Sequence, residues 1–272
     1  MPARRHFFIA EWLFVLGALL TLGSYLAYSQ YEEYLRSERD ERARLAQQAA
    51  IVEHNLVPQL AAANQALLSL IEDTPHFMSG KDGVQRLNRR LQVLNGILPG
   101  VRVLLMVDAT GKVIAANKTA LLGVMLSQRE WFATVAKGGS QQTLYLVAPV
   151  TSALNTYVSG LVRLVPGPRG EFAGAVYGSL HPEFAKTLLN SVVYTPDTLV
   201  TLVHGNGKVF VSTDDTLVGQ DVGVPGTLFS RHRESGQTTS LQMGAAKLSG
   251  TELMTALRTI HPPSLRMNTP LV

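Results

Sequence analysis

The side chains that could catalyse a reaction or bind a metal are scattered along the chain. Asp214 and Asp215 are adjacent carboxylates in a predicted loop, and neighbouring residues of an extended chain point in opposite directions, so the pair is poorly arranged for acid–base catalysis. The histidines show no H-x-x-x-H spacing that would place two metal ligands on one helical face: His6, His54, His76, His181, His204, His232 and His261. Because cysteine is absent as well, the sequence predicts neither a metal site nor a disulfide framework.

Motifs of nucleophilic catalysis and nucleotide binding are also missing. The chain has no G-x-S-x-G nucleophile elbow and no Walker loop. The stretch GPRGEFAG at 167–174 is rich in glycine, but it lies between two predicted strands and opens no helix, which favours a hairpin turn over a phosphate loop. We therefore expect no enzyme activity and no cofactor in this chain.

Composition and charge exclude several further classes of protein. The 272 residues are 46% apolar and 16% charged, which excludes a disordered protein and leaves room for one large or two ordinary domains. The formal net charge is +4, and Arg4 and Arg5 alone account for half of it. No basic patch is left over, so no nucleic-acid partner is expected.

An apolar run near the N-terminus predicts a membrane anchor. Residues 7–29 read FFIAEWLFVLGALLTLGSYLAYS and carry a single charged side chain, Glu11. A helix of this length reaches about 34 Å, more than the roughly 30 Å hydrocarbon core of a bilayer. Arg4 and Arg5 precede the run, so the positive-inside rule places residues 1–6 in the cytoplasm as a short stub.

The same rule places everything after about residue 29 outside the cytoplasm, so the predicted location is the inner membrane with a periplasmic or extracytoplasmic region. A cleaved signal peptide is the alternative, with Ala27 and Ser29 as small residues at the cleavage site. The uncleaved anchor is favoured because the run exceeds the 7–15 apolar residues of a signal peptide.

Residues 30–73 are predicted to form one long helix outside the membrane. Its first part, YEEYLRSERDERAR at 31–44, places many opposite charges three or four positions apart, which is typical of a solvated helix. An apolar stripe follows at steps of three and four: Leu45, Ala49, Val52, Leu56, Leu60, Ala63, Leu67 and Leu70. The stripe could pack within its own domain or form the interface of a homodimer, and a homodimer through this helix is expected. Pro58 lies within the helix and predicts a kink there.

Two strand–turn–strand patterns follow, and they form an internal repeat. The first is VRVLLMV, DATGK, VIAAN at 101–117, and the second is TLVTLV, HGNGK, VFVST at 198–213. With an offset of 96 residues, Gly111 falls on Gly207 and Gly123 on Gly219. A repeat of this length is the size of a domain, so it predicts two similar modules rather than a stacked array.

The first module, residues 74–194, is predicted to hold one antiparallel sheet of hairpin-linked strands with helices packed against it. A helix at 181–194 joins it to the second module, residues 195–272. The last strand of the first module, shifted by 96 residues, predicts a counterpart at 267–276, so the second module is expected to be incomplete. The predicted fold class is α+β: a transmembrane helix, a long extracytoplasmic helix and two tandem antiparallel-sheet modules.

With its cytoplasmic stub, single span, long helix and two PAS-like sheets, the first carrying R-E-W-F at 129–132, the chain resembles the double Cache extracytoplasmic sensor domains of bacterial receptors. The resemblance covers about residues 31–272. It implies that the membrane-distal module binds a small ligand and relays its occupancy through the helices to a cytoplasmic histidine kinase, diguanylate cyclase or chemoreceptor output. None of those output signatures is present in this sequence.

Carried over to this chain, the resemblance implies a ligand site in the first module. Arg129 would hold a ligand carboxylate with its two-pronged guanidinium, and Trp131 would wall the pocket, with Phe132 beside it. Tyr145 matches a position that lines the pocket. Amino-acid-binding members place an aspartate where Ser179 stands here, and a serine cannot neutralise an ammonium group. This departure favours a plain carboxylate, another small molecule or no direct ligand over an amino acid.

The favoured function is therefore the ligand-sensing input region of a membrane-anchored signal-transduction receptor, with a diguanylate cyclase or histidine kinase of a two-component system as the output. The alternative is a membrane-anchored binding or assembly protein that presents its modules to a soluble partner and has no output domain.

Overall fold

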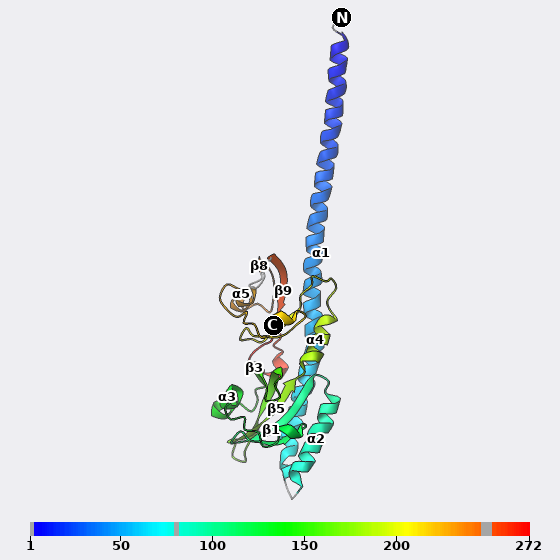
Figure 1. The fold of residues 1–272 in the computed structure, drawn as a ribbon. Coiled ribbons are helices and arrows are strands. Elements are labelled where there is room, and N and C mark those ends of the chain that lie inside the picture. The colour runs from blue at the N-terminus through cyan, green and yellow to red at the C-terminus, as the bar shows by residue number, and fades with distance from the viewer. Residues whose placement is uncertain (1–2, 79–81, 246–251) are drawn as a thin grey trace. The chain divides into compact units, whose positions relative to one another are not determined.

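The structure, a computed structural model, describes residues 3–78, 82–245 and 252–272. It divides into two compact units, residues 1–47 and 48–272, and Figure 1 shows the order of their elements. The α-helices are α1 (Ala3–Met78), α2 (Gly83–Ile97), α3 (Glu130–Gly138), α4 (Pro182–Asn190) and α5 (Leu228–Ser235). Short 3-10 helices lie at η1 (Thr119–Leu121), η2 (Asp215–Leu217) and η3 (Pro263–Leu265).

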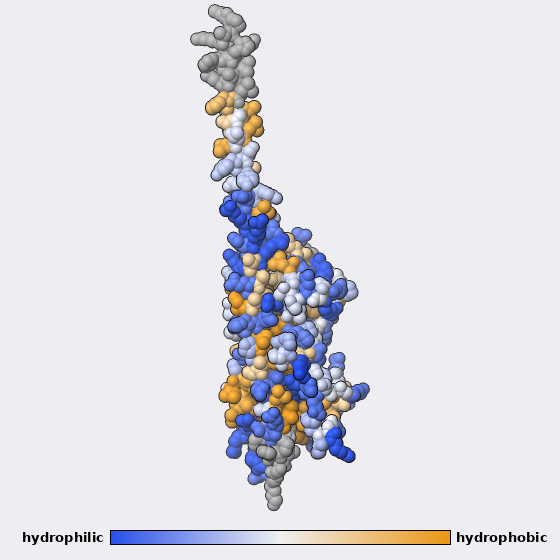
Figure 2. Space-filling model, turned by 180° about the vertical axis from the view of Figure 1, so that it is seen from behind, coloured by the Kyte–Doolittle hydropathy of each residue, from blue (hydrophilic) through white to orange (hydrophobic). Residues whose placement is uncertain are grey.

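The first unit is the N-terminal part of α1. Apolar side chains here are exposed rather than packed, as Phe14 at 79% and Leu20 at 64% illustrate. In Figure 2 orange side chains surround this part of the helix next to the grey N-terminal atoms, and blue ones follow. Within the described residues, no helix is both long enough and apolar enough to cross a bilayer. The span expected at 7–29 begins among side chains that lie outside the described part of the chain.

The second unit begins with the rest of α1, which carries the predicted apolar stripe into the core. The stripe residues from Val52 to Leu70 are buried, and Leu67 and Leu70 are fully so, which confirms the spacing argument for this face. The helix continues without interruption through Pro58. Beside it, α2 buries Leu87, Leu91 and Leu94 in the same cluster.

A five-stranded antiparallel sheet follows, as the sequence predicts for the first module. Its strands are β1 (Val101–Asp108), β2 (Val113–Ala116), β3 (Tyr145–Thr151), β4 (Tyr157–Pro166) and β5 (Phe172–Leu180), in the order β2-β1-β5-β4-β3. One face packs on α1 and α2 through Leu104, Met106 and Val176. The opposite face carries Val103, Tyr177 and their neighbours, which pack with α3 in a second cluster.

The C-terminal part repeats local features of this sheet at the predicted offset. Gly111 and Gly207 both adopt positive φ, 85° and 95°, and Gly123 and Gly219 do so at 79° and 83°. In each repeat the first glycine lies in the turn between the two strands, and the second lies two residues after the 3-10 helix that follows them, η1 or η2. These are left-handed backbone conformations, which favour glycine. The conformation therefore explains why glycine recurs at these positions 96 residues apart.

The strands of the second module, residues 195–272, do not form the single sheet that the repeat predicts. In the described residues it consists of two separate strand pairs, β6 (Thr201–Val203) with β7 (Val209–Ser212), and β8 (Thr239–Ala245) with β9 (Glu252–Arg258). Residues 270–272 lie between them: Val203 and Val272 exchange two backbone hydrogen bonds of 2.8 Å, and Leu271 exchanges two with Ile260. The expected final strand is thus represented by a few bridging residues.

Candidate functional site

A cavity of about 60 Å³ lies on the α3 side of the five-stranded sheet. Its walls come from β1, β4 and β5, from the segment that leads into α3, and from the tip of the β3–β4 hairpin. Most of the lining is apolar, and its polar and charged members are Arg102, Arg129, Ser152, Thr156, Tyr177 and Ser179. The volume is several times the 10–15 Å³ that one water requires, so a small organic molecule fits its scale.

Arg129 stands at the entrance to α3. It is the N-cap residue, with an extended backbone (φ −78°, ψ 133°), and its side chain makes no cap hydrogen bond. Instead its Nη1 donates to the carbonyl oxygen of Thr151 over 3.1 Å. Arg129 therefore ties the start of α3 to the end of β3, and the remaining donors of its guanidinium are available at the cavity wall.

Trp131 and Tyr177 form an aromatic wall. Their rings stack with centroids 5.3 Å apart and planes inclined by 27°. Burial raises the pKa of the Tyr177 hydroxyl, and the Arg129 guanidinium opposes part of that rise. Gly160 on β4 makes room for the tyrosine, because a Cβ there would lie 2.6 Å from the Tyr177 hydroxyl oxygen.

Ser179 lies two residues beyond Tyr177 on β5, so both side chains share one face of the sheet. The residue is 3% exposed. Ser179 is one of the residues that line the cavity, and its buried Oγ finds no hydrogen-bond partner among the described protein atoms. A buried hydroxyl without a partner costs about 1–3 kcal/mol of folding free energy, so the Ser179 hydroxyl is an unsatisfied polar group in a residue of the cavity wall.

Two of the five residues expected at the site lie outside the cavity. Phe132 follows Trp131 on α3, where the helical step of about 100° turns it into the core; it meets Phe172 edge to face at 5.6 Å. Tyr145 is on β3, and its hydroxyl accepts a hydrogen bond from the backbone N–H of Ser140 over 2.7 Å. The cavity thus gathers Arg129, Trp131 and Ser179 but neither of these rings.

Sequence reasoning missed three contributors to the cavity. Tyr177 could have been found by strand alternation, since it lies two positions before Ser179. Arg102 could not, because the β1–β5 register shifts between Val101 and Val103 and a bulge upsets the alternation. The hairpin tip was missed as well; there Ser152 Oγ accepts hydrogen bonds from the backbone N–H groups of Leu154 and Thr156, both 3.3 Å.

The charged residues that line the cavity are all positive among the described residues. Arg102 and Arg129 are cationic, and no aspartate or glutamate lines the cavity among the described residues. An anionic group would therefore find guanidinium donors, which can bind a carboxylate in a bidentate manner. A ligand ammonium would find no carboxylate to neutralise it.

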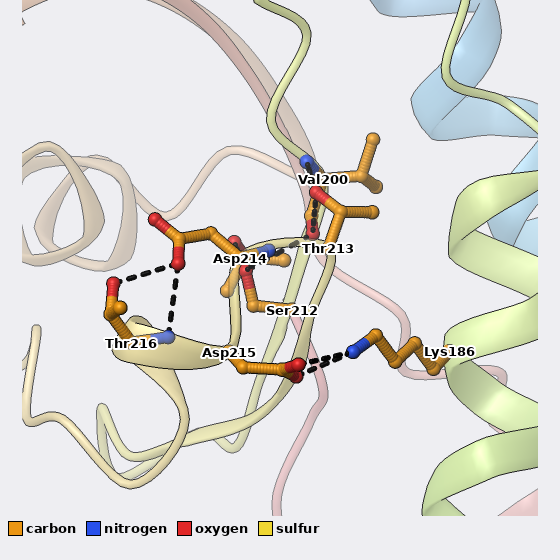
Figure 3. A network of polar contacts seen from close by, with 8 residues as sticks. Lys186, Val200, Ser212, Thr213, Asp214, Asp215 and Thr216 are labelled. Carbon is orange, nitrogen blue, oxygen red and sulfur yellow. Dashed lines mark hydrogen bonds and ion pairs between the residues drawn. The ribbon is translucent and has the colours of Figure 1, made fainter. Parts of the chain in front are cut away.

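The adjacent carboxylates Asp214 and Asp215 are already engaged within the protein. Figure 3 shows that Asp214 and Asp215 point in different directions, as expected from the sequence. Asp214 Oδ1 caps η2 by accepting hydrogen bonds from the backbone N–H and the hydroxyl of Thr216. The Asp215 carboxylate pairs with Lys186 Nζ at 2.5 and 2.6 Å. In the described part of the chain, no group of three potential metal ligands lies together.

A second cavity, of about 190 Å³, lies beside α5. Although it is larger, its polar groups are engaged: His232 Nδ1 lies 2.6 Å from Ser240 Oγ, and its Nε2 lies 2.9 Å from Thr259 Oγ1. The Arg233 guanidinium lies 5.7 Å from the centroid of the Phe229 ring. The smaller cavity is the stronger candidate because, among the described residues that line the two cavities, only Ser179 has a buried polar atom without a partner.

Comparison with solved structures identifies the fold. The extracellular domain of rpHK1S-Z16, a protein described as a histidine kinase, is 18% identical, with a TM-score of 0.72 over 88% of this chain and 93% of that one. The periplasmic sensory domain of the Campylobacter jejuni chemoreceptor Tlp1 is 9% identical, with a TM-score of 0.67 over 86% and 93%. The ligand-binding domain of the Pseudomonas fluorescens chemoreceptor CtaA, solved with L-isoleucine, is 14% identical, with a TM-score of 0.61 over 88% and 92%.

The chain therefore has the fold of extracytoplasmic sensor domains, as its resemblance to double Cache domains implies. No protein-family model and no curated protein sequence matches the chain.

Proposed function

We propose that residues 48–272 are the ligand-sensing input region of a membrane-anchored receptor, and that the ligand binds in the cavity beside α3. The observation that carries the proposal is the cavity itself, where Arg129, the Trp131–Tyr177 stack and an unpartnered Ser179 hydroxyl meet. Solved domains of the same fold belong to a protein described as a histidine kinase and to chemoreceptors.

The proposed ligand is a small carboxylate. Arg129 has donors to spare after its bond to Thr151, and the cavity lining includes Arg102 and Arg129 but no carboxylate among the described residues. CtaA was solved with L-isoleucine. In the described part of this chain no acidic residue lines the cavity, which argues against the ammonium group of an amino acid.

The proposed location is the inner membrane, with the sensor region on the periplasmic side. The apolar stretch at 7–29 and the preceding arginines support an anchor with this orientation. Occupancy of the cavity would pass through α1 to a cytoplasmic histidine kinase or diguanylate cyclase in a homodimer formed by that helix. The buried stripe of α1 links the sheet to the helix and supports this route.

A thermal-shift screen of the purified 272-residue chain, in mild detergent, tests the proposal. A small carboxylate should raise the unfolding temperature, because a ligand that binds only the folded state adds about 2.7 kcal/mol of stability at a hundredfold excess over its Kd. Arg129→Ala should remove the shift. The matched control, Arg169→Ala, removes an exposed arginine from the β4–β5 turn and should keep it. A full response in Arg129→Ala would refute this site.

A further inference from the structure

A simple carboxylate bound to Arg129 would leave the Ser179 hydroxyl without a hydrogen-bond partner. Ser179 is 3% exposed, and its Oγ has no hydrogen-bond partner among the described residues. The other buried serine of this sheet, Ser159, donates to the Val147 carbonyl over 2.7 Å. The sheet can therefore satisfy a buried serine, and Ser179 is an exception located at the cavity.

The charge around Ser179 restricts what its partner can be. Arg102 and Arg129 line the same cavity, and no acidic side chain does so within the described residues. A ligand ammonium beside Ser179 would be a desolvated cation without a counter-ion and close to two others. A neutral oxygen carries no such cost, since a serine hydroxyl can donate to a carbonyl oxygen or accept from a hydroxyl.

The size of the cavity limits the length of the ligand. The cavity measures about 60 Å³, so the ligand must be short, and an acid with its neutral oxygen on carbon 2 is the most compact molecule that offers both groups. The mostly apolar lining, which includes Leu121, Leu126 and Val158, suits a short hydrocarbon body.

We infer that the ligand is a short 2-hydroxy or 2-oxo carboxylate, with its carboxylate on Arg129 and its neutral oxygen on Ser179. This inference rests on the proposed function and sharpens it to a chemical class. Arg129 supplies affinity for the carboxylate, and Ser179 distinguishes a neutral oxygen from hydrogen or ammonium at carbon 2.

Four acids with one branched five-carbon skeleton test the inference. Isovalerate, 2-hydroxyisovalerate, 2-oxoisovalerate and valine differ only at carbon 2. Titration calorimetry on the full chain should give Kd values about five- to tenfold lower for the hydroxy or oxo acid than for isovalerate, the effect of about one satisfied hydrogen bond. Valine should bind more than tenfold more weakly than isovalerate.

Ser179→Ala should abolish the preference for the hydroxy or oxo acid while isovalerate still binds. Ser159→Ala is the matched control, and it should keep the preference. Equal binding of isovalerate and its hydroxy and oxo analogues, or tightest binding by valine, would overturn the inference while leaving the sensor proposal intact. Binding of none of the four acids, with another ligand still dependent on Arg129, would also overturn it. Carboxylate binding that ignores Arg129→Ala would instead refute the proposed site.

Discussion

Arg163 on β4 donates from Nε to the Oδ1 of Asn64 on α1 over 2.9 Å, although the two residues are 99 positions apart in sequence. Both side chains are buried. The Nη1 of Arg163 also donates to the backbone carbonyl of Gln141 over 3.2 Å. Burial, and secondly the Arg266 guanidinium, lower the pKa of Arg163. A buried cation is thus held by neutral partners that join the sheet to the long helix.

Replacing Asn64 by alanine should destabilise the second unit by about 1.5–3 kcal/mol, because a buried charged group loses a hydrogen-bond partner. Urea denaturation followed by circular dichroism measures the change. Gln65→Ala, at an exposed position on the same helix, should change stability by less than about 0.5 kcal/mol. Equal effects of the two substitutions would show that the Asn64–Arg163 bond contributes nothing.

Ser179→Ala and Ser159→Ala should shift stability in opposite directions without ligand. Removing the unpartnered Ser179 hydroxyl should raise stability by about 1 kcal/mol, whereas Ser159→Ala removes a made hydrogen bond and should lower it by a similar amount. For a chain of this size the expected shifts in Tm are roughly 2–4 °C. Calorimetry at one pH measures both. A loss of stability in Ser179→Ala would mean that its hydroxyl has a partner in the folded protein.

Gly160→Ala should weaken ligand binding by about tenfold or more, because the new methyl group displaces the Tyr177 ring and disturbs its stack with Trp131. Gly178→Ala is the control: a Cβ there meets Leu104 at 3.4 Å, an ordinary contact on the other face of the sheet. Tryptophan fluorescence in a Trp12→Phe background reports on Trp131 alone, since the sequence has 2 tryptophans. Unchanged emission and affinity in Gly160→Ala would refute the role of the stack.

Stability should fall as the pH drops from about 7 to 5, because two buried histidines are held neutral. Burial lowers the pKa of His232. Burial also lowers that of His204, with hydrogen bonds to Asn206 and the Leu146 carbonyl opposing part of the shift. A lowered folded-state pKa means that the unfolded chain binds more protons in this window, so their contribution is complete above the unfolded value near 6.5 and is lost on acidification.

His232→Gln should therefore flatten the slope of unfolding free energy against pH between about 5 and 7. His54→Gln, at an exposed position of α1, should leave the slope as it is in the parent chain. The measurement is a series of urea titrations at fixed ionic strength. An unaltered slope in both His232→Gln and His204→Gln would exclude these histidines as its source.

The orientation in the membrane can be tested with one cysteine, since the chain has none of its own. Ala120 is exposed on η1. Ala120→Cys should react with a membrane-impermeant maleimide in cells whose outer membrane has been made permeable. A cysteine at Ala3, in the predicted cytoplasmic stub, should react only after lysis. The reverse pattern would overturn the proposed orientation.

The sequence alone determined the features that depend on local patterns. The buried stripe from Val52 to Leu70 follows from helical spacing, and the strands of the first sheet follow from apolar runs bounded by turns. The repeated glycines at 111 and 207 follow from a left-handed turn conformation that favours glycine. Arg129 and Trp131 were identified through the resemblance to double Cache domains, because both belong to one short motif at the start of α3. The anchor at 7–29 and the homodimer remain predictions.

Only the tertiary structure decided which of these faces meet. Periodicity tells which residues share a face of a helix or strand, but not what lies opposite that face. The stack of Trp131 on Tyr177 exists because β5 inserts between β1 and β4 beneath α3. A single β-bulge brings Arg102 to the cavity against the alternation of its strand. The missing partner of Ser179 is likewise a property of everything packed around it, because a hydroxyl is satisfied or left unpaired by neighbours that are distant in sequence.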